Sequence, residues 1–230
     1  MTDWDLAIFI IFMRSLAEIH EALVHPGLIA VVRANRRDQV IPLTQALLNG
    51  GIRAIEITLT TPDAIAAIRE ACQVFGSTAL IGVGTVLDAT TAHAAMDAGA
   101  EFVVSPITKS EIAQAARSRN RLVMLGAFTP TEAQTAYEAG ADFIKLFPAE
   151  GLGSSYIKSL RAPLPHLRIV PTGGVDLTTI KSFFDVGCPA VGLGSSLITA
   201  QILEENDWLA LTERARTLIR ALDPVTKPQH

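Results

Sequence analysis

Residue types that mark secreted, metal-binding or redox proteins are scarce in this chain. Its 230 residues include two cysteines, Cys72 and Cys188, and no CxxC or HExxH motif. Two cysteines in a chain of this length do not form the disulfide framework of a secreted protein. The five histidines are too scattered for a dedicated metal site. We therefore expect two reduced thiols in the core, no metal and no cofactor.

Charged residues are also few. They make up 18% of the chain, against about 25% in a typical soluble domain, and this suggests that part of the surface is buried in an oligomer. The net charge is −4 and no basic run occurs. Nucleic-acid binding needs a cationic stripe and is therefore not expected. An anionic substrate would have to be bound by local donors rather than by a general positive field.

The apolar run near the N-terminus is too short to cross a membrane. It covers residues 6–13, whereas a spanning helix needs about 20 apolar residues. Acidic residues, Asp3 among them, stand where a signal peptide carries positive charge. We expect a cytoplasmic protein without membrane contact. In it, residues 1–15 form an apolar tail or extra helix, 16–222 the folded domain and 223–230 a frayed tail.

Eight short runs rich in Val, Ile, Leu and Phe alternate with amphipathic helical patterns. Nearly continuous apolar runs are typical of strands buried on both faces of a parallel sheet, and the alternation places helices around that sheet. We predict a single-domain α/β protein, a (β/α)8 TIM barrel. The predicted strands lie in residues 28–34, 54–59, 79–86, 102–106, 122–128, 143–148, 168–174 and 190–196.

An internal repeat supports closure of the barrel. Gly51, Gly99, Gly140 and Gly187 each end a helical pattern and precede an even-numbered strand. A residue in the left-handed conformation is commonly required at the end of a helix, and glycine adopts it without strain. Because the repeat recurs every two strand–helix units and no strand is missing, a closed barrel is favoured over an open doubly wound sheet.

Lys145 is the clearest candidate for chemistry. It is one of five lysines and lies within FIKLFP, a buried-strand pattern, although lysine is rarely fully buried. Alternation places Phe143, Lys145 and Phe147 on one face of the strand. The amine is poorly solvated there, which favours the neutral form that attacks a carbonyl. The competing interpretation is a lysine that merely pairs with a carboxylate at the barrel mouth.

Glu56 is the second candidate, because an acidic residue inside the apolar strand pattern AIEITL requires a partner or a role. Close to Lys145 it could stabilise the ammonium group or transfer protons as a general acid–base. An inert ion pair with Lys145 or Arg33 is the alternative. Chemistry in such barrels takes place at the carboxyl ends of the strands, where all three residues are predicted to lie.

Polar and glycine-rich turns follow three other strands. In barrels, the loops after strands seven and eight commonly bind a phosphate through backbone N–H groups, which glycine allows to approach closely. Tight turns without a ligand are the alternative. Thr85, after the third strand, could bond a substrate carboxylate or simply fill a small space. The predicted phosphate-binding residues are Thr172, Gly173 and Gly174 after strand seven, and Gly194 and Ser195 after strand eight.

These motifs, in this order and spacing, resemble the 2-keto-3-deoxy-6-phosphogluconate (KDPG) aldolase family. They are EITLTTPDA, GVGTV, SP, GAFTPTE, FIKLFPAE, PTGG and GLGSSL, and the resemblance covers residues 16–222. The family includes 4-hydroxy-2-oxoglutarate aldolases. Its members are trimeric class I aldolases that cleave KDPG to pyruvate and glyceraldehyde 3-phosphate, so the resemblance implies a homotrimer that acts on a 2-keto-3-deoxy sugar acid phosphate and on pyruvate.

The resemblance also implies roles for individual residues. Lys145 would form the Schiff base and Glu56 would be the general acid–base. The remaining implied positions are Thr85 for the pyruvate carboxylate, Pro106 and Phe147 for the pocket walls, and Thr172, Gly173, Gly174 and Ser195 for the phosphate.

One position departs from the family pattern. Many members read E-x-T-L-R-T, in which the Arg binds the pyruvyl carboxylate, and here that position is Thr60. We expect Arg33, at the end of strand one, to supply the missing cation. A branch that cleaves the galactonate epimer reads E-I-x-L-x-[ST]-P, which EITLTTP also fits. The alternatives are therefore a phosphogalactonate aldolase, an epimerase or decarboxylase without a Schiff base, and a catalytically silent barrel.

Overall fold

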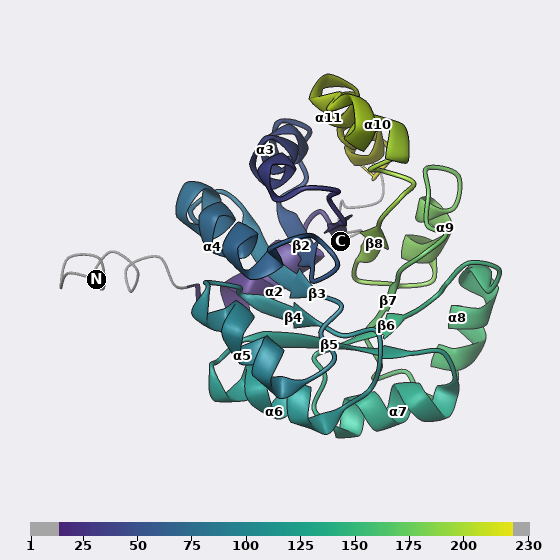
Figure 1. Ribbon diagram of the computed structural model, residues 1–230. Helices are drawn as coiled ribbons and strands as arrows, with labels where there is room; N and C mark the ends of the chain where they lie inside the picture. The colour runs from purple at the N-terminus through teal and green to yellow at the C-terminus, as the bar shows by residue number, and fades with distance from the viewer. Residues whose placement is uncertain (1–13, 223–230) are drawn as a thin grey trace.

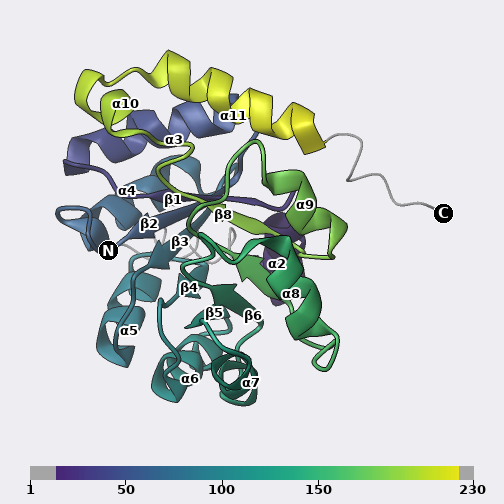
Figure 2. The same cartoon turned by 90° about the vertical axis from the view of Figure 1, so that its right-hand side faces the viewer.

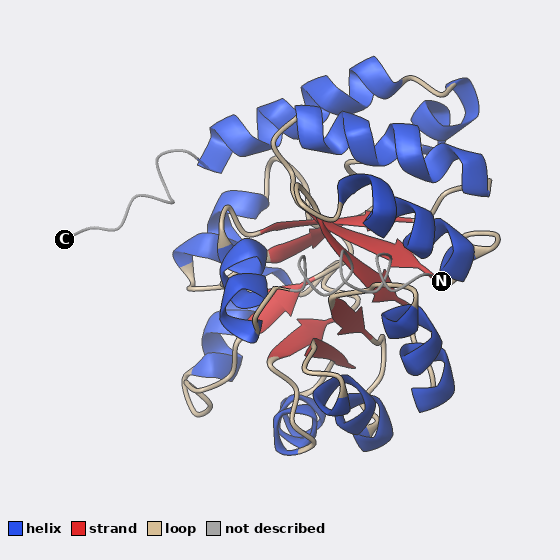
Figure 3. Cartoon of the chain, turned by 90° about the vertical axis from the view of Figure 1, so that its left-hand side faces the viewer, coloured by secondary structure: helices blue, strands red, loops and turns tan. Residues whose placement is uncertain are grey.

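A ring of parallel strands lies inside a ring of helices (Figures 1 and 3). The computed structural model describes residues 14–222. Its strands are β1 (Leu28–Val32), β2 (Ala54–Thr58), β3 (Leu80–Gly84), β4 (Phe102–Val104), β5 (Leu122–Ala127), β6 (Phe143–Leu146), β7 (Ile169–Pro171) and β8 (Val191–Leu193). Its helices are α2 (Leu16–Val24), η1 (Arg37–Gln39), α3 (Val40–Asn49), α4 (Ala64–Phe75), α5 (Ala89–Asp97), α6 (Ser110–Ser118), α7 (Pro130–Glu138), α8 (Gly153–Arg161), α9 (Ile180–Asp185), α10 (Ala200–Glu205) and α11 (Trp208–Leu222).

The strand order closes the barrel and confirms the predicted fold. Neighbours follow the chain from β1 to β7, and β1 pairs with β8 as well as with β2. A bridge between Thr172 and Gly192 joins the end of β7 to β8. Each predicted run contains one strand, but the strands are shorter than the runs. The difference arises mainly because the last residues of each run already belong to the loops at the barrel mouth.

The repeated glycines have the predicted backbone conformation. The φ angles of Gly51, Gly99, Gly140 and Gly187 are +95°, +112°, +100° and +83°. A side chain is strained at these angles, so glycine allows each helix to end and the chain to turn directly into the next even-numbered strand.

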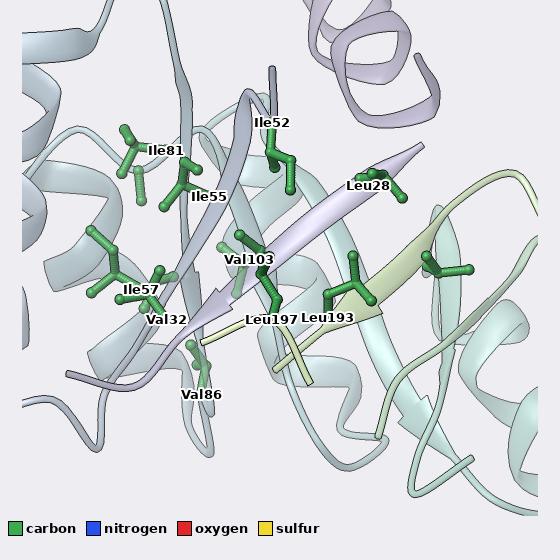
Figure 4. Packing of buried hydrophobic residues seen from close by; sticks show 14 of the residues in the cluster. Leu28, Val32, Ile52, Ile55, Ile57, Ile81, Val86, Val103, Leu193 and Leu197 are labelled. Carbon is green, nitrogen blue, oxygen red and sulfur yellow. The ribbon is translucent and has the colours of Figure 1, made fainter. Parts of the chain in front are cut away.

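The apolar core has two layers. Outward-facing strand residues pack against the helices, and Figure 4 shows part of this layer, including Ile55, Ile57 and Leu193. Inward-facing residues at the amino ends of the strands form a separate group with α2, which we call the base cluster. It consists of Ile19, Leu23, Ile29, Ala54, Leu80, Phe102, Val104, Leu122, Met124, Phe143, Val170 and Ala190. Helix α2 therefore closes the amino end of the barrel, and only the carboxyl end remains open to ligands.

The last described helix packs on the outside of the barrel. Helix α11 runs beside α3 on its outer surface (Figure 2). The predicted tails, apart from Arg14 and Ser15, lie outside the described residues. Ser15 caps α2 through a reciprocal pair of bonds with Glu18. Between residues 14 and 222, no helix combines the length and apolar character needed to cross a membrane.

Candidate active site

Lys145 lies on the inner face of β6, above the base cluster. Its side chain is buried, with 5% of the residue exposed. On β5 the residue in register with it is Gly126, so no neighbouring side chain from that strand displaces it. The amine Nζ lies 5.3 Å from the centre of the Phe147 ring. The predicted face, with Phe143, Lys145 and Phe147 together, is the face that points into the barrel.

Glu56 reaches Lys145 across the barrel from β2. The distance from Lys145 Nζ to Glu56 Oε1 is 3.5 Å, and Glu56 is 3% exposed. Among the described residues, Glu56 Oε1 has no hydrogen-bond partner. A buried carboxylate oxygen of this kind can accept a proton from a group placed next to it, because its lone pairs are not already engaged.

Gly84 on β3 makes room for this carboxylate. A Cβ atom at position 84 would lie only 2.0 Å from Glu56 Oε1, so no residue other than glycine fits beside Glu56 in this arrangement. Sequence reasoning placed Gly84 within GVGTV but gave it no role. The pattern could not reveal one, because the contact depends on which strand lies next to β2 and on its register.

Arg33 is exposed at the end of β1 and is held by Thr60. Its Nε donates to Thr60 Oγ1 at 3.1 Å, and Thr60 Oγ1 lies 2.8 Å from Thr58 Oγ1. The carboxylate of Glu56 pairs with Lys145 and not with Arg33. Of the two ion pairs considered for Glu56, the structure therefore has the one with Lys145. Thr60, which replaces the arginine of the family pattern, thus orients Arg33, the cation that we expected to take over the role of that arginine.

Thr85, Pro106 and Phe147 line the mouth close to this pair. Thr85 is half-buried and has a φ of +63°, a strained conformation for a β-branched residue and one that is often found at functional sites. Pro106 is half-buried, and its carbonyl approaches β5 so closely that a Cβ at Gly126 would lie 2.1 Å from it. Phe147 is 39% exposed. These three residues lie in the loops that follow β3, β4 and β6.

The turns after β7 and β8 lie next to each other. Thr172 is 6% exposed, and its hydroxyl covers Gly192 of β8, where a Cβ would lie 2.4 Å from Oγ1. Gly173 and Gly174 have φ angles of +84° and +77°, and a Cβ at Gly194 would meet nothing within 4 Å. Open space for an anion bound by N–H groups therefore lies against the backbone at Gly194, whereas a Cβ at Gly174 would lie 2.7 Å from the Cβ of Glu150.

Some backbone N–H groups of these turns have no hydrogen-bond acceptor among the described residues. Within the described residues, the N–H groups of Gly174 and Ser195 donate no hydrogen bond, and both residues are exposed. Two residues that sequence reasoning did not assign, Ser196 and Arg214, make hydrogen bonds that hold the β8 turn.

Other nucleophiles and ligands are poorly placed. Cys72 and Cys188 are free thiols, and burial raises the pKa of both to about 12. Neither thiol is therefore ionised to an appreciable extent at neutral pH. No three His, Cys, Asp or Glu side chains gather to form a metal site in the part of the chain that the structure describes. Among the lysines of residues 14–222, Lys145 is the one whose side chain is buried.

The comparison with known proteins agrees with this geometry. A model of the KDPG and KHG aldolase family matches residues 19–214. This chain belongs to that family. It is therefore an aldolase, a carbon–carbon lyase, and the resemblance drawn from its motifs is confirmed.

Individual relatives in this family carry two substrate names. The 2-dehydro-3-deoxy-6-phosphogalactonate aldolase of Escherichia coli (strain K12) is 37% identical over 174 residues, which cover 75% of this chain and 85% of the relative. The 2-dehydro-3-deoxy-phosphogluconate aldolase of Treponema pallidum (strain Nichols) is 37% identical over 200 residues, covering 84% and 92% of the two chains. The similarity alone therefore does not favour one sugar acid.

Solved structures are similar to this chain as well. The KDPG aldolase of Legionella pneumophila, solved with pyruvate captured at low pH as a covalent carbinolamine intermediate, superposes with a TM-score of 0.77 at 27% identity. The match covers 87% of this chain and 97% of that one.

Proposed function

We propose that this aldolase cleaves 2-keto-3-deoxy-6-phosphogluconate to pyruvate and glyceraldehyde 3-phosphate through a Schiff base on Lys145. The observation that carries the proposal is the buried pair at the barrel mouth, with Lys145 Nζ 3.5 Å from Glu56 Oε1. A lysine that attacks a carbonyl needs a neighbouring group that takes up and returns protons. The covalent pyruvate adduct of the Legionella relative is consistent with the same chemistry.

The reaction follows from the two side chains. Lys145 Nζ attacks the C2 carbonyl to form a carbinolamine, which loses water to give an iminium ion. Glu56 then accepts the proton of the C4 hydroxyl as the C3–C4 bond breaks, and the bonding electrons move into the iminium to form an enamine. The aldehyde leaves, C3 is protonated, and water hydrolyses the iminium to release pyruvate and the free lysine.

Arg33 and Thr85 are the proposed ligands of the pyruvyl carboxylate. A carboxylate in a partly dry pocket gains most from a charged donor, and Arg33 is the arginine that the Thr60–Thr58 hydroxyl chain orients. Thr85 directly follows β3, which lies between β2, the strand of Glu56, and β4, the strand that precedes Pro106. Pro106 and Phe147 form the apolar wall beside Lys145 in this arrangement.

The phosphate is proposed to bind at the turns after β7 and β8. The residues concerned are Thr172, Gly173, Gly174, Gly194 and Ser195. Support comes from the positive φ angles of the two consecutive glycines, the open space at Gly194 and the unengaged N–H groups of Gly174 and Ser195. Backbone donors suit a net-acidic protein, since they bind an anion without a general positive field.

A second candidate substrate is the galactonate epimer, 2-keto-3-deoxy-6-phosphogalactonate. It is favoured by the E. coli relative and by the EITLTTP motif. Cleavage of 4-hydroxy-2-oxoglutarate to pyruvate and glyoxylate is a further proposed activity, because the Lys145–Glu56 pair acts on the half of the substrate that all three compounds share. A parallel measurement of kcat/KM for the three compounds decides their order.

We also propose that the protein works as a homotrimer in the cytoplasm. The support is the low charge of the chain and several exposed apolar side chains on the mouth loops, among them Leu87, Ile107 and Phe128. Light scattering at the working concentration tests the assembly, and a stable monomer would contradict it.

Trapping with pyruvate and borohydride tests the central proposal. Reduction should fix one pyruvyl group on the wild-type protein, visible as an increase in intact mass, and peptide mapping should place it on Lys145. Lys145→Ala should lose both the adduct and the cleavage activity. Lys158→Ala, which removes an exposed lysine from α8, is the matched control and should behave as wild type. Adduct formation in Lys145→Ala would refute the assignment.

A further inference from the structure

Arg214 joins helix α11 to the turn after β8. Its Nε donates to the carbonyl of Leu197 at 3.2 Å, and its Nη2 donates to the carbonyl of Ser196. A guanidinium group is planar and presents several donors in a fixed arrangement. Two contacts to successive carbonyls therefore hold this stretch of backbone in one orientation relative to α11.

Ser196 passes this restraint on to the turn after β7. Its hydroxyl donates to the carbonyl of Val175 at 2.5 Å. Val175 directly follows the two glycines of the β7 turn, and Ser196 directly follows Ser195. The contacts thus form a continuous chain from α11 through the β8 turn to the β7 turn, and each turn carries one half of the proposed phosphate site.

The same segment is organised internally. The carbonyl of Gly194 accepts from the N–H groups of Leu197 and Ile198, at 3.0 and 2.9 Å. The carbonyl oxygens of Ser196 and Leu197 thus point toward Arg214, while the Ser195 N–H donates to no described residue. The geometry of the β8 turn then depends on two attachments, the contact of Ser196 with Val175 and the contacts of Arg214 with Ser196 and Leu197.

Arg214 makes this attachment across a gap. A cleft of about 410 Å³ separates α11 from the two turns, and its lining includes Asp176, Leu177, Ser196, Arg214 and Leu218. Packing does not fill this space, and Arg214 itself is exposed. Its hydrogen bonds to the carbonyls of Ser196 and Leu197 therefore connect α11 to the β8 turn beside this cleft.

We propose that Arg214 and Ser196 are positioning residues that set the distance between the two phosphate-binding turns. Neither needs to touch the substrate. This inference rests on the proposed function, because it assigns them to the phosphate half of that site. Their contacts involve neither Lys145 nor Glu56, so binding of the phosphate should depend on them while the chemistry at C2 to C4 should not.

Paired substrates test the proposal. Kinetics are measured with KDPG, which carries the phosphate, and with 4-hydroxy-2-oxoglutarate, which lacks it. Arg214→Gln should raise KM for KDPG by about five- to tenfold, the scale of a lost charge-assisted hydrogen bond, and change kcat/KM for 4-hydroxy-2-oxoglutarate by less than about twofold. Ser196→Ala should act in the same direction, and Arg214→Lys should restore part of the loss.

Inorganic phosphate provides a readout that does not depend on turnover. It should raise the Tm of the wild-type protein, and the concentration for half of that shift should increase in Arg214→Gln and Ser196→Ala. Arg216→Gln is the matched control, because Arg216 lies on the same helix and, within residues 14–222, pairs only with Glu213 of that helix. It should match wild type in both assays.

The possible failures are distinguishable. If the wild-type protein cleaves neither compound, the proposed function fails and this inference falls with it. If the wild-type protein is active and Arg214→Gln and Ser196→Ala match Arg216→Gln, only the inference is overturned. If Arg214→Gln lost the same share of kcat/KM with both substrates, Arg214 would have a general structural role, and the inference would be overturned as well. Should Arg214→Gln not fold, Arg214→Lys and Ser196→Ala carry the same test.

Discussion

The inner faces of the strands differ between the base of the barrel and its mouth. At the base, Phe102, Leu122 and Phe143 fill the interior with apolar side chains under the cover of α2. Two positions beyond Ala54 on β2 and Phe143 on β6, the interior holds Glu56 and Lys145, and the neighbouring strands contribute glycine instead of large side chains.

The difference shows how a stable fold supports a reactive site. A buried ion pair costs several kcal/mol of desolvation per charge, and Coulomb attraction offsets this only in part. The base cluster and the outer apolar layer contribute the burial that stabilises the barrel. The mouth can therefore hold a lysine and a carboxylate that face each other without full hydrogen bonding.

Phe143→Ala is expected to have the largest effect on stability. Phe143 is fully buried and lies on the same face of β6 as Lys145, two residues earlier. Removing its ring should lower the free energy of unfolding by about 3–5 kcal/mol, and kcat of the folded fraction should change little. Chemical denaturation beside steady-state kinetics checks both. A large loss of kcat without a loss of stability would contradict the view that the base stabilises the fold while the mouth carries the chemistry.

Two glycines on β3 provide a sharper contrast. A Cβ at Gly82 would lie 2.4 Å from the Phe102 ring, whereas one at Gly84 would lie 2.0 Å from Glu56 Oε1. Gly82→Ala should therefore overpack the base and cost about 1–3 kcal/mol of stability. Gly84→Ala should displace Glu56, the proposed general base, and lower kcat by roughly a hundredfold. The two variants serve as controls for each other, and identical profiles would contradict the assignment of Glu56.

Arg33→Ala should change substrate binding at the mouth without changing stability, and its effect should be smaller than those of the preceding variants. Loss of the carboxylate ligand should lower kcat/KM by roughly ten- to a hundredfold, about 1.4–2.7 kcal/mol, mainly through a higher KM for pyruvate in the condensation direction. Arg36→Ala is the control, since Arg36 is exposed in the same loop and pairs with Asp38. A fall in kcat with an unchanged KM would mean that Arg33 orients other groups instead of binding the carboxylate.

Removal of divalent metals should have no effect. An iminium ion on Lys145 withdraws the electrons of the breaking C3–C4 bond, so no Lewis acid is needed at the mouth. Dialysis against EDTA should leave the rate unchanged. A loss of activity that a divalent cation restores would contradict the proposed mechanism.

Several features of this protein follow from the sequence alone. The eight strands, the glycines that end every second helix and the inward face of Phe143, Lys145 and Phe147 depend on residues close together in the chain. Local periodicity and backbone preference determine such features. The family resemblance rests on short motifs of the same kind, and for that reason it could be stated before the fold was known.

Other features were decided only by the tertiary structure. The approach of Lys145 to Glu56, the room that Gly84 leaves for the carboxylate and the orientation of Arg33 by Thr60 depend on register and side-chain conformation across different strands. Arg214 and Arg216 stand on one amphipathic helix and look alike in the sequence. They differ in role because one faces the β8 turn and the other pairs with Glu213 on its own helix, and only the packing of α11 against the barrel determines which one does so.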